Sequence, residues 1–377
     1  MRSAICDMLG IEFPLLAFSH CRDVVAAVSR AGGFGVFGAT AHSPDSVRRE
    51  LAWITEHAGG KPFGIDVLIP ENMATAGEKD VTYNSLRSRV PEQHTAFAET
   101  LLSRAGVAMA DVDVSDARPQ PFDPATALNV LDAAFEFPIR LIANALGVPP
   151  PSMIEKGKRH GVPVAALVGA KEHALRQVAA GVDILVVQGS EAGGHCGEVS
   201  TLVLVPEVIE AIRPMRVVPV LAAGGIMNGG QMAACMAMGA AGAWTGSVWL
   251  ATVESETSEI FREKMIEASS RDAIRTRCRT GKPARQLRSA WTEAWDRDPT
   301  SPGALPMPLM SLVSENALRS AERAAAAGND KARELVTYFV GQGVGLIHEV
   351  RSAGQVVQSF KEEFLEAVER LDLLLAD

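Results

Sequence analysis

The stretch DILVVQGSEAGGH, residues 183–195, begins as an apolar run and ends in a glycine pair that a histidine follows. An apolar run that does not alternate with polar residues is typical of a parallel strand that helices cover on both faces of the sheet. Glycines at the end of such a strand let the chain turn sharply and let a ligand approach the backbone closely. The stretch therefore predicts a buried strand whose carboxyl end carries function.

Seven more segments share this apolar character, and each is followed by a Gly, Pro or polar break and then by a segment of helical period. They are residues 13–18, 33–40, 62–69, 138–144, 163–169, 219–225 and 242–247. Eight parallel strands that alternate with helices predict an α/β fold, the (β/α)8 TIM barrel. In such a barrel the loops at the carboxyl ends of the strands carry the chemistry.

Two parts of the chain depart from this regular spacing. Residues 70–137 separate the third strand from the fourth and predict an inserted segment. We expect a barrel domain over residues 1–255 that contains this insertion, and a mostly helical extension over residues 256–377 that packs on the barrel. The last helical segment carries an apolar stripe that predicts a cap over the barrel mouth or a dimer contact: Val356, Val357, Phe360, Phe364, Val368 and Leu371.

Composition excludes several classes of protein. The net charge of −9, from 36 Lys and Arg against 45 Asp and Glu, argues against a nucleic-acid partner, which needs clustered positive charge. The five cysteines lack CxxC spacing, so they predict neither a disulfide framework nor a metal site, and they fit a cytoplasmic protein. The uncharged residues 217–253 are broken by glycines and a proline, which favours barrel interior over a membrane span.

Three successive strands of the predicted barrel end in glycine-rich turns. These turns are EAGGH (191–195), AAGGI (222–226) and WTGS (244–247), and the last two are followed by helix starts. Backbone N–H groups at such turns bind anions, and TIM barrels often hold a phosphate after their seventh and eighth strands. The sequence therefore predicts a cofactor that carries a phosphate group.

These motifs resemble those of the nitronate monooxygenase family, also called 2-nitropropane dioxygenase-like, and of the neighbouring flavin-dependent enoyl-ACP reductases. The matching pieces span nearly the whole chain: AAVSRAGGFGVFGA (26–39), KPFGIDVLIP (61–70), ALGVPPP (145–151), GVDILVVQGSEAGGHCG (181–197), VPVLAAGGI (218–226), MGAAGAWTGSVWLATVES (238–255), GKPARQL (281–287) and GQGVGLI (341–347). The resemblance implies an FMN-binding (β/α)8 barrel.

The resemblance also implies roles for particular residues. It places the FMN phosphate on the two turns after the seventh and eighth strands, and the flavin ring beside the turn after the sixth. The implied cofactor-binding residues are Asp66, Lys171, Gln188, Gly193, Gly194, Ala223, Gly224, Gly225, Thr245, Gly246 and Ser247. Lys171 would place a cation near the flavin N1 atom, although a solvated lysine in the first turn of a helix is an open alternative.

His195 matches the position that serves these enzymes as a base or as a group that orients the substrate. A histidine near its unperturbed pKa can take a proton from a carbon next to a nitro group or donate to an oxygen. Around the end of the first strand, relatives usually have a glutamine and a methionine, whereas this chain has Phe18, Ser19 and His20, which we expect in the substrate pocket. A capping or exposed role for His20 stays open.

Asp66 is a second departure, because the family commonly has an asparagine that binds the flavin at this position. An ionised carboxylate can accept a hydrogen bond from a flavin N–H group but cannot donate one. Its negative charge would also disfavour an anionic reduced flavin or an anionic nitronate nearby.

Three functions fit these observations. The first is an FMN-dependent oxidoreductase that, like nitronate monooxygenase, oxidises alkyl nitronates with O2 to a carbonyl compound and nitrite. The second is an NAD(P)H-dependent flavin reductase that acts on an enoyl thioester or a quinone, and the third is a flavin- or ligand-binding protein without catalysis. We expect a small-molecule substrate, and neither a metal, a nucleic acid nor a membrane as a partner. Two questions stay open: whether the protein forms a homo-oligomer, and whether it uses NAD(P)H as a reductant.

Overall fold

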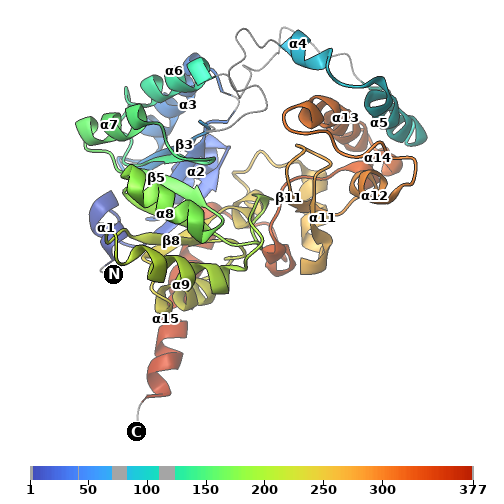
Figure 1. Ribbon diagram of the computed structural model, residues 1–377. Helices are drawn as coiled ribbons and strands as arrows, with labels where there is room; N and C mark the ends of the chain where they lie inside the picture. Colours follow the sequence, from blue (N-terminus) through green and yellow to red (C-terminus); the bar gives the residue numbers. More distant parts are fainter. Residues whose placement is uncertain (1–2, 41, 70–82, 110–123, 376–377) are drawn as a thin grey trace.

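The centre of the molecule is a closed barrel of eight parallel strands, in a computed structural model that describes residues 3–40, 42–69, 83–109 and 124–375 (Figure 1). The strand order is β1-β2-β3-β4-β5-β6-β8-β9. Each strand overlaps one predicted segment: β1 Leu15–Ser19, β2 Phe34–Gly38, β3 Phe63–Val67, β4 Ile142–Asn144, β5 Val164–Val168, β6 Ile184–Gln188, β8 Val220–Ala223 and β9 Gly242–Thr245. The prediction of a TIM barrel is therefore confirmed.

Successive side chains of each strand point alternately to the barrel interior and to the surrounding helices. In β3, the outward side chains of Phe63, Ile65 and Val67 join the apolar layer under the helices. The interior is filled by a separate apolar cluster that includes Leu16, Phe34, Val36, Leu141, Ala143, Ala165, Ile184, Val186, Leu221, Ala223 and Trp244. By this alternation Asp66 belongs to the interior face, at the carboxyl end of β3.

The helix α1, Ala4–Leu9, precedes β1, and its buried Ile5 and Leu9 belong to the interior cluster. The helices that surround the barrel are α2 Arg22–Arg30, α3 Pro44–His57, α6 Pro124–Ala134, α7 Pro151–His160, α8 Lys171–Ala180, α9 Thr201–Ile212, α10 Gly229–Ala237 and α15 Ala353–Leu373. Asn228 caps α10, because its side-chain oxygen accepts a hydrogen bond from the N–H of Gln231 at 2.8 Å. After β9 the chain continues as the short 3-10 helix η2, Ser247–Ala251.

A second apolar core lies beside the barrel, in the lobe on the right of Figure 1. Its helices come from two separate parts of the chain: α4 Tyr83–Arg87 and α5 Glu92–Arg104, and then α11 Glu259–Glu267, α12 Ala290–Arg297, α13 Leu309–Ala326 and α14 Asp330–Leu335. Buried residues of α5, such as Phe97 and Leu101, pack in the same cluster as Trp291 and Trp295 of α12. Part of residues 70–137 thus joins the C-terminal lobe, whereas α6 covers β3 of the barrel.

A three-stranded antiparallel sheet joins the barrel mouth to this second core. It consists of β7 Gly194–His195, β10 Ala273–Thr276 and β11 Ala284–Leu287, in the order β10-β11-β7. The segment 256–377 therefore contains strands that its helical pattern did not predict. Two 3-10 helices, η3 Ser270–Asp272 and η4 Gln342–Leu346, lie next to each other near this sheet.

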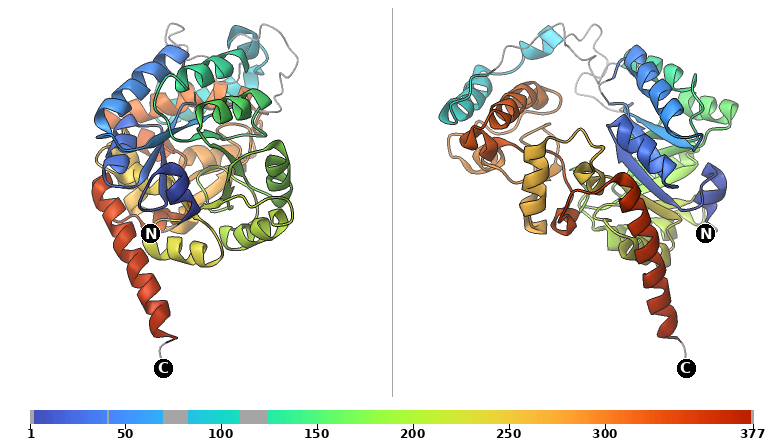
Figure 2. Two further views of the ribbon diagram at one scale, coloured as in Figure 1. Left: turned by 90° about the vertical axis from the view of Figure 1, so that its left-hand side faces the viewer. Right: turned by 180° about the vertical axis from the view of Figure 1, so that it is seen from behind.

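The last helix, α15, packs on the outer helical layer between α10 and α2 (Figure 2). Its residues Val356, Val357 and Phe360 are buried in the barrel core, whereas Val368 and Leu371 farther along are 46% and 52% exposed. The helix thus takes the place of the helix that follows the eighth strand of a TIM barrel. The expected cap over the barrel mouth is not formed by this helix, and a dimer contact through its exposed half remains a prediction.

The division of the chain at residue 255 also remains a prediction. Residues 70–82 and 110–123 of the expected insertion lie outside the described residues. Among the helices that the structure describes, none is long and apolar enough to cross a membrane.

Candidate functional site

Three glycine turns meet at one edge of the barrel, because β6, β8 and β9 are neighbours and all run in the same direction. Gly193 and Gly194 follow β6, Gly224 and Gly225 follow β8, and Gly246 follows β9. The backbone φ angles of Gly194, Gly224 and Gly225 are 73°, 101° and 73°, a region that side-chain-bearing residues rarely adopt. The structure therefore brings together the glycine motifs that the sequence singled out.

The turns after β8 and β9 offer hydrogen-bond donors. Among the described residues, no protein acceptor binds the backbone N–H groups of Gly224, Gly225 and Gly246. A Cβ atom added at Gly246 would meet nothing within 4 Å, so there is open space beside this turn. Clustered free N–H groups with space in front of them suit an anion, and they fit the phosphate group that the sequence predicts here.

The segment that contains η4 packs directly on these turns. The hydroxyl of Ser247 accepts a hydrogen bond from the N–H of Gly341 at 2.8 Å, and the carbonyl of Glu191 accepts one from the N–H of Gln342 at 2.8 Å. A Cβ atom at Gly193 would lie only 2.8 Å from the backbone N of Gly341. The sequence marked this segment only as a family match, and the structure adds it to the site.

Hydrogen bonds fix the loop that carries His195. The Glu191 carboxylate accepts from the backbone N and the hydroxyl of Thr201 at 2.9 and 3.0 Å, which ties the loop to α9. The buried Arg285 side chain donates to the carbonyls of Ser190 at 2.9 Å and Ala273 at 2.6 Å. Charged hydrogen bonds of this kind hold the loop in one place relative to the second core.

His195 lies on β7, where it pairs with Ala284 of β11. Its Nε2 atom is 2.8 Å from the hydroxyl oxygen of Thr280. Burial, and then the positive charge of Lys282, lower the pKa of His195 to about 4, so the ring is neutral at pH 7. Thr280 and Lys282 were missed by sequence reasoning, since no local pattern connects them to a histidine some 85 positions away.

Other predicted cofactor residues lie in the walls of the barrel. Gln188 is partly buried at the end of β6, where it pairs with Ala223 of β8. The Thr245 hydroxyl is used inside the protein, because it donates to the carbonyl of Leu16 at 2.9 Å and accepts from the indole N–H of Trp249 at 2.9 Å. The single O–H donor of Thr245 is therefore used, so this hydroxyl could donate to a cofactor only if its bond to Leu16 were replaced.

The predicted pocket residues lie together at the end of β1. The ring of Phe18 is stacked on Trp244 with 6.2 Å between centroids, and His20 meets Phe18 edge-on at 5.1 Å. His20 is exposed, and its Nδ1 atom is 2.8 Å from the carbonyl oxygen of Gly38. Ser19 is the last residue of β1 and is partly buried. Their role in binding a substrate remains a prediction.

Lys171 and Asp66 differ sharply in their surroundings. Lys171, in the first turn of α8, is 3.1 Å from Glu207 of α9, and this bond raises the pKa of the ammonium group. Its charge is thus already paired between two outer helices, and a flavin contact remains a prediction. Asp66 is only 3% exposed, its Oδ1 atom has no hydrogen-bond partner among the described residues, and burial raises its pKa to about 8.

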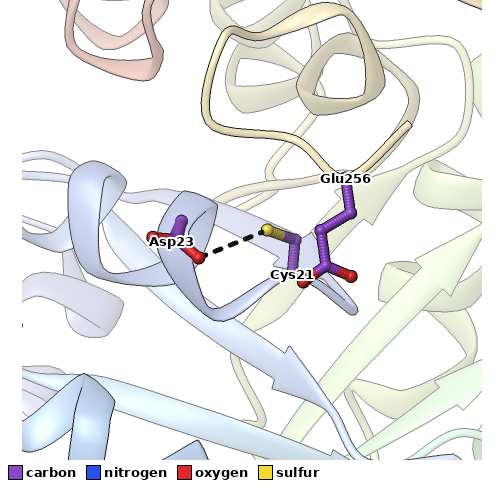
Figure 3. Close-up of side chains that lie close together, drawn as sticks. All are labelled: Cys21, Asp23 and Glu256. Carbon is purple, nitrogen blue, oxygen red and sulfur yellow. Dashed lines mark hydrogen bonds between the residues drawn. The ribbon is translucent and has the colours of Figure 1, made fainter. Parts of the chain in front are cut away.

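One cluster of possible metal ligands lies near the end of β1, among the residues that the structure describes. Cys21, Asp23 and Glu256 have ligand atoms within 4.8 Å of one another (Figure 3). The Cys21 thiol donates to the carbonyl of Glu254 at 3.1 Å, and burial raises its pKa. Because a thiol must lose its proton to bind a metal, these contacts favour a structural role for Cys21.

The fold is a TIM barrel, and glycine turns follow its neighbouring strands β6, β8 and β9 at one edge. The family model described as "Nitronate monooxygenase" matches residues 2–363, so the chain belongs to the nitronate monooxygenase family and is an oxidoreductase.

Individual relatives agree with this family. A Mycobacterium tuberculosis protein named "Putative monooxygenase Rv1533" is 52% identical over the whole length of both chains. The solved structure of nitroalkane oxidase from Streptomyces ansochromogenes is 26% identical, with a TM-score of 0.79 over 98% of this chain and 100% of that chain. FabK from Thermotoga maritima is 27% identical, with a TM-score of 0.71 over 99% of each chain.

Proposed function

We propose that this chain binds FMN at the carboxyl ends of its barrel strands and oxidises alkyl nitronates with O2 to a carbonyl compound and nitrite. The observation that carries the proposal is the pair of glycine turns with free N–H groups, on the same carboxyl edge of the barrel as the loop that carries the neutral imidazole of His195, in a chain of the nitronate monooxygenase family. When bound, the flavin supplies the electron-transfer chemistry that connects the nitronate to O2.

The residues present fit the phosphate of FMN. The backbone N–H groups of Gly224, Gly225 and Gly246 would hold its oxygens, and the Ser247 hydroxyl lies at the same turn. Gly341 packs against Ser247 and closes this side of the site. Binding through backbone donors leaves no charged side chain to be neutralised, so the site keeps its geometry whether or not the anion is present.

The state of His195 favours a nitronate over a neutral nitroalkane as the substrate. A group with a pKa of about 4 holds a proton poorly at neutral pH, so it is a weak base for removing a proton from carbon. A nitronate has already lost that proton. The neutral ring can still orient a nitronate oxygen by a hydrogen bond, and the positive charge of Lys282 that acts on this ring also attracts an anion.

The overall reaction balances without a further co-substrate, since two nitronate anions and one O2 give two carbonyl compounds and two nitrite ions. Each C–N bond that breaks is replaced by a C–O bond to an oxygen atom from O2. The contribution of the chain is to hold the nitronate near the flavin through His195 and to keep the ring of His195 in place through Thr280.

A second candidate is an NAD(P)H-dependent flavin reductase acting on an enoyl thioester or a quinone. The observation that favours it is the similarity to FabK over the whole length of both chains. The two candidates share the flavin site and differ in what reduces the flavin. The test below separates them.

The experiment is to mix the FMN-loaded protein, without oxygen, with a preformed alkyl nitronate, with the neutral nitroalkane, or with NADPH or NADH. We expect loss of oxidised flavin absorbance with the nitronate, and a slower loss with the nitroalkane. Reduction only by a nicotinamide would contradict the proposal and support the reductase. His195→Asn should still bind FMN but turn over the nitronate at least tenfold more slowly, as expected when an orienting group is lost.

A further inference from the structure

Asp66 is a buried carboxyl group that receives no compensating charge from the residues that the structure describes. It is the fourth residue of β3, 3% exposed, and its Oδ1 atom has no hydrogen-bond partner among the described residues. A buried oxygen without a partner costs free energy, and an ionised carboxylate in such a place costs much more. Such a group calls for a physical explanation, and a ligand that supplies the missing hydrogen bond is one.

The neighbours of Asp66 explain why its carboxyl group is not satisfied from within. Its partners across the sheet are Gly38 in β2 and Ala143 in β4, and neither has a polar side chain. The nearest amide in the sequence of β4, Asn144, is committed to another loop, because its oxygen accepts from the N–H of Ile69 at 2.9 Å and its nitrogen donates to the carbonyl of Gly147 at 3.1 Å.

Among the residues that the structure describes, the charged groups on the elements packed against β3 have neighbours other than this carboxyl group. The strands β2 and β4 contain no ionisable residue. On α2, Arg22 pairs with Glu50, Arg30 donates to the carbonyl of His57, and the partly buried Asp23 lies beside Cys21. On α6, Asp132 pairs with Lys156.

The titratable ring of His20 comes from the loop after β1 and lies against Gly38, where its Nδ1 atom bonds to the backbone carbonyl. Burial is the cause that raises the pKa of Asp66, and no neighbouring charge in the described part of the chain contributes to it. The carboxyl group is consequently neutral at pH 7 and has an O–H donor as well as an acceptor.

We propose that Asp66, in its protonated form, donates a hydrogen bond to an acceptor atom of the bound flavin ring. This rests on the proposed function, since it requires a flavin whose phosphate is held at the turns after β8 and β9 and whose ring covers the strand ends. Asp66 and both turns lie at the same carboxyl edge of the barrel. A neutral acid brings no negative charge to the ring, so it does not oppose an anionic nitronate or an anionic reduced flavin.

The test is the affinity of the flavin-free protein for FMN between pH 7 and pH 9, measured by the change in flavin fluorescence. The second pKa of a phosphate monoester is near 6, so the FMN phosphate does not titrate in this range. Because only the protonated acid can donate, the Kd of the wild-type protein should rise about tenfold from pH 7 to pH 9. Asp66→Asn, whose amide donates at every pH, should bind with a Kd that does not change over this range.

Riboflavin is the matched control ligand, because it contains the ring but lacks the phosphate. The same pH dependence with riboflavin supports Asp66, whereas a dependence seen only with FMN would place its origin at the phosphate turns and overturn the proposal. A wild-type Kd that is constant from pH 7 to pH 9, or an Asp66→Asn profile that equals the wild-type one, also overturns it. If neither ligand binds at any pH, the proposed function fails together with this inference.

Discussion

Replacing Asp66 by asparagine should change how the free energy of unfolding of the flavin-free protein depends on pH. The folded pKa of Asp66 is about 8, and that of an unfolded aspartate is about 3.9. Between these values the folded protein holds a proton that the unfolded chain releases, so stability falls as the pH rises. Below pH 4 both states are protonated, and above pH 8 both are ionised, so the loss is confined to this window.

The size of the effect follows from the pKa difference. Each pH unit inside the window costs about 1.4 kcal/mol, so the wild-type protein should lose about 4 kcal/mol relative to Asp66→Asn between pH 5 and pH 8. The assay is urea unfolding at each pH, followed by the fluorescence of the five tryptophans. When the two proteins are compared at the same pH, the contributions of all other titrating groups to the free energy of unfolding cancel.

Asp132→Asn serves as the matched control, because Asp132 is an aspartate whose side chain is 57% exposed on α6. Its difference from wild type should vary by less than about 1 kcal/mol over the same range, as is usual for an exposed ion pair. If the difference between wild type and Asp66→Asn is the same at pH 5 and pH 8, the reasoning about a protonated buried carboxyl group is wrong.

Three further predictions concern the loops around the site. Gly225 has a φ of 73°, so the alanine in Gly225→Ala should be strained by about 1 kcal/mol. In a binding titration this variant should lose more affinity for FMN than for riboflavin. Equal affinities of the variant and the wild type for FMN would show that this turn does not bind the phosphate. Thr280→Val removes the hydrogen-bond partner of His195, so it should lower kcat/KM for a nitronate about tenfold and leave the Kd for FMN unchanged. Thr280→Ser keeps the hydroxyl and should restore the wild-type kcat/KM. A wild-type kcat/KM in the valine variant would contradict a positioning role for Thr280. Arg279→Met breaks two hydrogen bonds of 3.0 Å to Glu315 in the second core and should reduce the free energy of unfolding by about 3 kcal/mol. An unchanged midpoint of urea unfolding would contradict this prediction.

Local sequence was sufficient to predict the barrel. Every strand of the barrel is a short apolar run with a break after it, and that pattern depends only on neighbouring residues. The glycine turns could be predicted for the same reason, since the residues of each motif are adjacent in the chain and the alternation of strands and helices places them at one edge. Family resemblance then assigned a ligand to that edge.

The second lobe was not predictable in this way. The helix α5 packs with α13, although more than 200 residues separate them, and α15 returns to the barrel after the whole lobe has been formed. The strand β7 consists of only two residues and exists because β11 pairs with it. A pattern within one segment carries no information about such a partner.

The chemical states of the site were decided by tertiary structure alone. The sequence shows an aspartate at position 66 and a histidine at 195, and their ordinary pKa values would make the first ionised and the second half-protonated near pH 6.5. Burial raises the pKa of Asp66, so that this carboxyl group is protonated at pH 7, and lowers the pKa of His195, so that its ring is neutral even at pH 6.5. Desolvation depends on which atoms surround a group in space, so the residues were determined by the sequence and their protonation by the fold.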